Sequence, residues 1–151
     1  MGARTKMAGV QIEEIELVEA WSEENEEVRA QFDFPLTAAS GCTSCSVIYY
    51  VIEPGHRTPM HIHSCEEIQG IVEGKTEVTV GDEVQTFEAE ALDAVPALTR
   101  HSLNNVGDTP LRVIGFFSSA AAIHTYEDTL VPFDTDLLVT PTPEELRIQA
   151  D

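Results

Sequence analysis

The chain has 151 residues, of which 42% are hydrophobic, so it is long enough to bury one proper core and is interpreted as a single domain. Its 27 acidic and 8 basic residues give a formal net charge of -19, which argues against nucleic acid and anionic membranes as partners. No apolar run approaches the roughly 20 residues that span a bilayer, and the amino terminus lacks the apolar core of a secretory signal, so we expect a cytoplasmic protein.

Residues 1–45 are expected to form an extension that packs on the rest of the domain. Within it, residues 10–20 (VQIEEIELVEA) alternate loosely between apolar and polar side chains and predict an edge strand. Residues 21–31 (WSEENEEVRAQ) have the charge and length of a short helical or irregular segment, with the glutamates in solvent.

Short apolar runs dominate residues 46–120. The first of them, residues 46–53 (SVIYYVIE), is rich in β-branched and aromatic side chains and is closed by Pro54 and Gly55, which predicts a strand. Six further runs, separated by turn signals, cover residues 66–74, 75–80, 82–89, 92–97, 101–106 and 111–119. Short strands at this spacing, with nothing helical between them, predict an all-β barrel or sandwich.

Residues 121–151 are expected to form a C-terminal strand and tail. Thr142, Pro143 and Glu145 have the spacing of a helix cap, a first helical position and a capping-box partner, so a short closing helix is predicted.

Three side chains that can bind a metal lie between Gly55 and Gly74. His61 and His63 are two residues apart, so on a strand they face the same point. Glu67 shares their parity, but an unbroken strand would leave it roughly 13 Å from His63, too far to share an ion. We therefore predict that residues 64–66 reverse the chain in a hairpin, so that Glu67 returns on the neighbouring strand beside the histidines.

A further imidazole is available in the segment AVPALTRHSLNN, where His101 follows Pro96 by five residues and precedes Asn105 by four. Two imidazoles and a carboxylate already fit iron(II), manganese, nickel, copper or zinc. A third imidazole would leave one or two coordination positions open for water, substrate or dioxygen.

These segments carry the resemblance to a family. Residues 55–74 resemble motif 1 of the cupin superfamily, Gly-x5-His-x-His-x3-Glu-x6-Gly, at every specified position. Residues 90–105 resemble motif 2, Gly-x5-Pro-x-Gly-x2-His-x3-Asn, except that Glu90 and Leu98 stand at its two glycine positions. The resemblance covers roughly residues 47–119.

The resemblance implies an all-β, single-domain cupin (jelly-roll) barrel that holds one divalent transition metal, iron(II) being expected. The implied ligands are His61, His63, Glu67 and His101. In the catalytic role that the resemblance implies, Glu67 is a metal ligand, a base for substrate protons, or both. The alternative for the whole set is a cupin that keeps its ligands but is isolated without metal.

Four other side chains are weighed as functional groups. Arg57 and Arg100 are interpreted as surface charges, with binding of an acidic group as the alternative. His56 and His124 are interpreted as surface or structural residues, with a hydrogen bond to a metal ligand or a proton transfer as the alternative.

The number of cysteines and the net charge indicate the redox state and the salt concentration to which the protein is adapted. Three cysteines, an odd number, argue against a disulfide framework. Cys42 and Cys45 are interpreted as coincidence or core packing rather than as a redox or zinc motif, and Cys65 as a turn residue. The acidic excess fits a high-salt cytoplasm and an ordinary acidic cytosolic protein equally well.

The alternation in residues 111–119 predicts two different faces. Leu111, Val113 and Phe117 would point inward and, with residues 46–53, make a mainly apolar cavity suited to a small organic ligand.

On the opposite face of this strand, Ile114 and Phe116 lie with Arg112. Something must cover these two apolar side chains, either the amino-terminal strand or a second subunit. Because cupins commonly pair through a barrel face, we predict a homodimer.

The ligand set alone does not select a chemistry. The first hypothesis is a non-haem dioxygenase that cleaves a carbon–carbon bond of a small enolisable or aromatic substrate with dioxygen. The second is an isomerase, decarboxylase or lyase that uses the metal only as a Lewis acid. The third is a non-catalytic protein that binds a small molecule or stores a metal.

Overall fold

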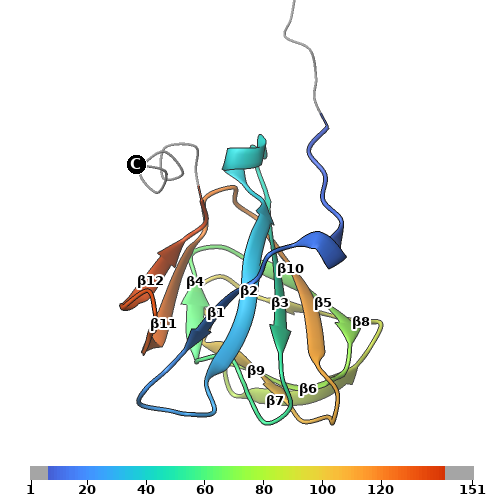
Figure 1. The fold of residues 1–151 in the computed structure, drawn as a ribbon, viewed down its shortest axis with the longest axis vertical. Helices are drawn as coiled ribbons and strands as arrows, with labels where there is room; N and C mark the ends of the chain where they lie inside the picture. The colour runs from blue at the N-terminus through green and yellow to red at the C-terminus, as the bar shows by residue number, and fades with distance from the viewer. Residues whose placement is uncertain (1–6, 142–151) are drawn as a thin grey trace, which may run out of the picture.

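The computed structural model describes residues 7–141, which form two six-stranded antiparallel sheets facing each other as a barrel (Figure 1). We call them the β3 sheet and the β4 sheet. The β3 sheet has the order β1 (Val18–Trp21), β2 (Arg29–Leu36), β3 (Ser46–Ile52), β10 (Leu111–Phe117), β5 (Glu67–Glu73) and β8 (Ala91–Val95). The β4 sheet has the order β12 (Thr135–Val139), β11 (Ile123–Leu130), β4 (His61–His63), β9 (His101–Asn105), β6 (Lys75–Val80) and β7 (Glu83–Glu88). The predicted all-β fold is confirmed.

The core lies between the sheets and is built by period-2 alternation. Its buried members come from β3, β5, β6, β9 and β10, and they are Tyr50, Ile52, Ile71, Val78, Leu103, Leu111 and Val113. Leu111, Val113 and Phe117 are each no more than 2% exposed, so the inward face predicted for this strand is confirmed. Burying one such side chain contributes about 1.5–3 kcal/mol.

The N-terminal segment differs from its prediction. Only the last part of the edge strand expected over residues 10–20 forms, because β1 begins at Val18 at the edge of its sheet and a 3₁₀ turn occupies Ile12–Glu14. The helical alternative for residues 21–31 is wrong, because β2 already begins at Arg29 and pairs with β3. Residues 22–28 are turns and irregular backbone, in which Glu24 N and Asn25 N donate to Ser22 Oγ at 3.1 and 3.2 Å, so the irregular alternative holds there.

The structure tests the predicted closing helix and the expected lack of a membrane span only within residues 7–141. The closing helix expected at Thr142, Pro143 and Glu145 lies outside residues 7–141. Within that range, we find no helix long and apolar enough to cross a membrane.

The predicted hairpin between the histidines and Glu67 is wrong. Strand β4 pairs with β9 and β11, whereas β5 pairs with β8 and β10 in the other sheet. Residues 64–66 cross between the sheets, and their backbone is bound elsewhere: Ser64 N donates to Ile123 O at 2.9 Å and Glu66 N to Ser118 Oγ at 3.1 Å. Glu67 therefore faces the histidines across the barrel.

The loops of motif 2 keep a left-handed backbone without glycine. Glu90 has φ 71° and Leu98 has φ 61°. A side chain in this region costs about 1–2 kcal/mol. The conformation is held by hydrogen bonds, since Glu90 N donates to Ile71 O at 2.8 Å and Leu98 N to His63 O at 2.9 Å.

The outer face of the β3 sheet is apolar along its central strands. Phe116 is 47% exposed and pairs in register with Ile68, which is 39% exposed, and Leu92 on β8 is 72% exposed. Strand β1 does not cover these side chains, because it joins the far edge of the same sheet beside β2. The homodimer stays a prediction.

Candidate metal centre

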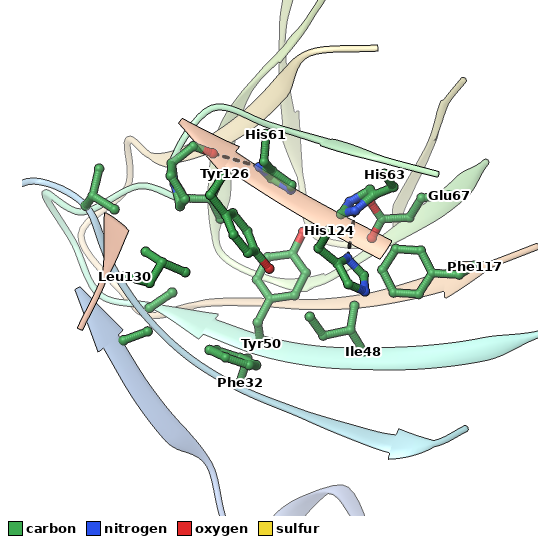
Figure 2. Close-up of a pocket in the computed structure, with 15 residues that line it drawn as sticks. Phe32, Ile48, Tyr50, His61, His63, Glu67, Phe117, His124, Tyr126 and Leu130 are labelled. Atoms are coloured by element: carbon green, nitrogen blue, oxygen red, sulfur yellow. Dashed lines mark hydrogen bonds and ion pairs between the residues drawn. The ribbon is translucent and has the colours of Figure 1, made fainter. Parts of the chain in front are cut away.

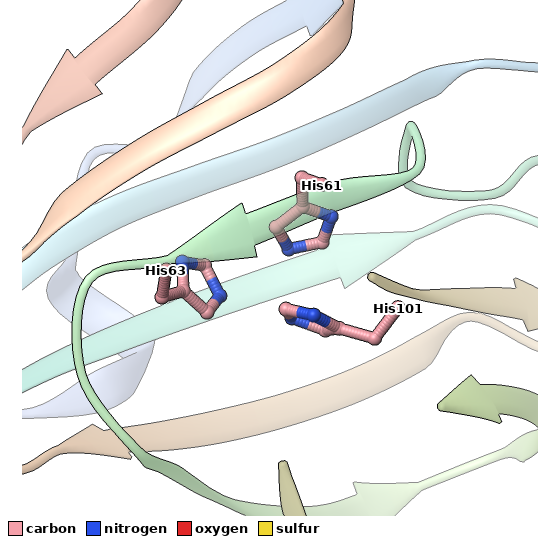
Figure 3. A group of neighbouring side chains, drawn as sticks. All are labelled: His61, His63 and His101. Atoms are coloured by element: carbon pink, nitrogen blue, oxygen red, sulfur yellow. The ribbon is translucent and has the colours of Figure 1, made fainter. Parts of the chain in front are cut away.

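Three buried imidazoles meet inside the barrel (Figure 3). His61 and His63 extend from the inward face of β4, and His101 begins β9 directly opposite His61 in the ladder. Their nearest ligand atoms all lie within 4.8 Å of one another, and the three residues are 7%, 5% and 0% exposed. The predicted same-face arrangement of His61 and His63 is what brings them to one point.

Glu67 approaches this group from the opposite sheet. Its Oε1 lies 3.2 Å from His63 Nε2 and 3.6 Å from His101 Nε2, and the residue is 2% exposed. The carboxylate fits only because β10 carries Gly115 beside it: a Cβ on Gly115 would stand 2.1 Å from Glu67 Oε2.

Backbone carbonyls determine the tautomer of two of the imidazoles. His61 Nδ1 lies 2.7 Å from Pro59 O, and His101 Nδ1 lies 2.8 Å from Thr99 O. A carbonyl only accepts, so each Nδ1 carries the proton, and each Nε2 presents a lone pair to the interior. His101 Nε2 is buried and has no hydrogen-bond partner.

This arrangement fits a divalent transition metal. Two atoms bound to one ion at about 2.1 Å lie about 3.0 Å apart at a right angle and about 3.6 Å apart at 120°. The Glu67 distances of 3.2 and 3.6 Å match those values, and an ion would satisfy the orphaned lone pair of His101. Three nitrogens and one oxygen suit several metals and do not select one of them.

The protonation states also suit a cation. Burial lowers the pKa of His61 well below its ordinary value, and burial lowers the pKa of His63 against the opposing effect of Glu67. Burial alone would raise the pKa of Glu67, but the opposing effect of the neighbouring His101 and His63 outweighs burial and brings the pKa to about 2. Metal binding needs neutral imidazoles and an ionised carboxylate.

A cavity of about 60 Å³ adjoins the histidines (Figure 2). Its apolar walls come from five strands and include Ala20, Ala30, Phe32, Ile48, Phe117 and Leu130. The predicted apolar cavity is therefore present, although Leu111 and Val113 belong to the adjoining core instead of lining it.

Two phenols supply polar groups to this cavity. Gln69 Nε2 donates to Glu67 Oε1 at 3.2 Å and to Tyr50 OH at 3.3 Å, which leaves the Tyr50 proton available to a ligand. The Tyr126 ring lies 5.4 Å from that of His61, and both hydroxyls end in the pocket (Figure 2). Burial raises the pKa of Tyr50 and of Tyr126, so both stay protonated donors.

Sequence reasoning did not single out Tyr50, Gln69 or Tyr126. Tyr50 had a signal, because it shares the inward parity of Ile48 and Ile52 in β3. A hydroxyl in such a position needs a partner. The other two had no comparable signal, since their neighbours come from strands distant in sequence.

Of the other predicted functional residues, the two arginines lie outside the pocket and His124 lies inside the barrel. Arg57 pairs with Glu27 at 3.2 Å and Arg100 with Glu127 at 3.0 Å, and neither lines the pocket. The surface interpretation of His124 is wrong, because this residue is 0% exposed and its Nδ1 lies 2.8 Å from His63 Nδ1.

Comparison with known proteins agrees with this architecture. The family model described as Cupin domain matches residues 48–117. Residues 48–117 are therefore similar to a cupin domain. The polyketide synthase CurC of Streptomyces cyaneus is 33% identical over 82 residues, which are 54% of this chain and 53% of that relative. The match thus spans about half of the relative's length.

Two solved cupin structures share the fold. The oxalate decarboxylase of Lactobacillus farciminis has a TM-score of 0.63 and 21% identity, covering 74% of this chain and 33% of its own. A provisionally named sugar phosphate isomerase from Acidithiobacillus ferrooxidans has a TM-score of 0.60 and 19% identity, covering 76% of each chain. At these identities the likeness establishes the fold alone.

Proposed function

We propose that this cupin is a metal-dependent enzyme acting on a small enolisable or aromatic substrate, and that it is a non-haem dioxygenase. The observation that carries the proposal is the placement of the histidines and Glu67 at one end of an apolar pocket. The apolar lining suits an organic ligand, its volume of about 60 Å³ restricts that ligand to a small one, and the ligand set leaves coordination positions open.

In this proposal, separate residues bind the metal, donate a hydrogen bond to the substrate and pack against its carbon skeleton. His61, His63, His101 and Glu67 would hold the ion, which supplies Lewis acidity when bound and, if it is redox-active, electrons for dioxygen. The Tyr50 hydroxyl donates to the anionic oxygen of an enolate or phenolate, as donors do where negative charge develops. Phe32, Ile48 and Phe117 hold the carbon skeleton.

Glu67 serves mainly as a ligand in this proposal. A carboxyl group with a pKa of about 2 takes up a proton weakly near neutral pH, which makes it a poor base. We expect Glu67→Gln to lower metal content as well as turnover. A variant that keeps full metal content but loses turnover would instead assign the role of base.

Oxygen consumption tests the dioxygenase assignment. Protein made without added metals and reloaded with iron(II) is assayed in an oxygen electrode against diketones, flavonols and catechol-like compounds. We expect substrate-dependent oxygen uptake that the metal-free protein lacks. Turnover of any of these substrates without oxygen uptake would overturn the assignment.

A second candidate is metal-assisted enolate chemistry without oxygen. It is favoured by the relative named polyketide synthase CurC, together with the Tyr50 and Tyr126 hydroxyls in the pocket. Product formed under anaerobic conditions with a redox-inactive metal such as zinc would support it. Metal binding without turnover on either panel would instead support the non-catalytic alternative.

We also propose that two copies pair through the outer face of the β3 sheet. The apolar side chains Ile68, Leu92 and Phe116 remain exposed there, and a shared interface would cover them. Sedimentation of the wild type is expected to give a dimer. Phe116→Asp is expected to give a folded monomer, and an unchanged dimer would contradict this interface.

A further inference from the structure

A chain of three buried polar side chains runs from the metal centre to the end of β12. His63 and His124 are paired in the β4–β11 ladder, and their Nδ1 atoms lie 2.8 Å apart. His124 Nε2 lies 3.0 Å from Thr140 Oγ1. His124 and Thr140 are both 0% exposed, and His63 is 5% exposed. Water therefore does not compete for these contacts.

The chain of contacts allows two proton arrangements. In the first, His63 Nδ1–H donates to His124 Nδ1, and His124 Nε2–H donates to Thr140 Oγ1, which leaves a lone pair on His63 Nε2. In the second, Thr140 donates to His124 Nε2 and His124 Nδ1–H donates to His63 Nδ1, so His63 Nε2 carries a proton. Both arrangements contain the same number of protons.

Only the first arrangement permits a metal at His63. Its Nε2 points toward Glu67 Oε1 at 3.2 Å, and a proton there would satisfy the carboxylate and occupy the lone pair that an ion needs. His61 and His101 do not have this choice, because backbone carbonyls accept from their Nδ1 atoms.

We propose that His124 and Thr140 are positioning residues that set the tautomer of His63 and so tune the affinity of the site for a divalent metal. This rests on the proposed metal-dependent function. His124 acts by accepting from His63 Nδ1, and Thr140 acts one step further away, by accepting from His124. The Phe34 and Phe117 rings, whose centroids lie 5.2 and 4.9 Å from that of His124, hold the imidazole in place.

Zinc is a suitable probe because it is diamagnetic and redox-inactive. We expect His124→Phe, which keeps an aromatic ring but removes the acceptor, to weaken Zn²⁺ binding by about 10- to 100-fold, as loss of a ligand's hydrogen-bond partner does. Thr140→Val should weaken binding less. Thr140→Ser, which keeps the hydroxyl, should restore an affinity close to that of the wild type. Competition with a chromophoric chelator measures each value.

Nitrogen-15 chemical shifts of the His63 ring test the mechanism directly. In the metal-free wild type we expect a proton on Nδ1, and in metal-free His124→Phe a proton on Nε2. Phe34→Leu is the packing control, because it disturbs the His124 ring without removing a hydrogen bond, and it should leave the His63 tautomer unchanged. Thermal unfolding of each variant establishes that it is folded.

The outcomes separate this proposal from the proposed function. Weaker Zn²⁺ binding by His124→Phe with an unchanged His63 tautomer would overturn the positioning role, as would wild-type affinity in that variant. If the wild type bound no divalent metal, the proposed function would fail. The ring shifts of the metal-free proteins would then decide the tautomer role alone, and identical shifts in wild type and His124→Phe would overturn it.

Discussion

Gly115→Ala is the smallest change that should disturb the metal centre without removing any functional group. The added methyl carbon would stand 2.1 Å from Glu67 Oε2 and 2.7 Å from Ile48 Cγ2. Ordinary contacts begin at 3.4 Å, so the Glu67 carboxylate must retreat by about 1.3 Å, the difference between 3.4 and 2.1 Å. Its Oε1 now lies 3.2 Å from His63 Nε2, and a shift of that size would take it out of the shared coordination sphere.

Overpacking of this kind costs about 1–3 kcal/mol of folding stability, and each kcal/mol lowers the Tm by roughly 2–4 °C in a chain of this size. Loss of one charged ligand should lower metal affinity at least about tenfold, which corresponds to 1.4 kcal/mol. Both effects follow from one methyl group placed against one carboxylate.

The assay is Zn²⁺ affinity by chelator competition, together with thermal unfolding. Gly70→Ala is the matched control on the neighbouring strand, because its Cβ would meet Leu92 Cδ2 at 3.6 Å and Ile114 O at 3.7 Å, both ordinary contacts. In a Glu67→Ala background, Gly115→Ala should add little further loss of affinity. If Gly115→Ala bound Zn²⁺ as tightly as Gly70→Ala, the steric reasoning would be refuted.

Three further predictions follow from the site and its loops. Replacing His61 or His101 by alanine should abolish metal binding, as elemental analysis would show, whereas the His124→Phe variant should still bind at saturating metal. Glu90→Gly and Leu98→Gly should each stabilise the protein by roughly 0.5–1 kcal/mol in urea unfolding, because glycine removes the left-handed strain at some cost in chain entropy. Burial lowers the pKa of His124 to about 3, below its unfolded value of about 6.5, so the unfolded state binds more protons between these values. The free energy of unfolding of the metal-free protein should therefore fall as the pH drops from 6.5 toward 3, with a slope of up to about 1.4 kcal/mol per pH unit for this histidine, and a flat profile would contradict its burial as a neutral ring.

Local regularities explain what could be predicted from the sequence. Alternation along β10 is a property of a few consecutive residues, so the inward Leu111 and the outward Phe116 followed directly from it. The i, i+2 spacing of His61 and His63 works in the same way. Spacing and parity made Glu67 a candidate ligand, and the resemblance of residues 90–105 to the second cupin motif did the same for His101.

Long-range pairing explains what could not be predicted. The spacing of His63 and Glu67 fits a hairpin and a crossing between sheets equally well, and the choice depends on the partners of β4, which lie some 40 and 60 residues further along the chain. His124 reaches His63 across 61 positions of sequence. At Glu90 and Leu98 the fold overrides local preference, because both residues keep the left-handed backbone conformation that a residue with a side chain disfavours.

The origin of the pocket walls has a consequence for how such proteins diversify. Ala20, Ala30 and Phe32 line the cavity but lie before residue 48, where the match to the cupin family begins. One part of the pocket wall is therefore encoded in a stretch of the chain apart from the candidate metal ligands, while Ile48, Tyr50 and Phe117 lie in the same stretch as those ligands. A library of substitutions confined to β1 and β2 would reshape that part of the wall and leave His61, His63, Glu67 and His101 unchanged.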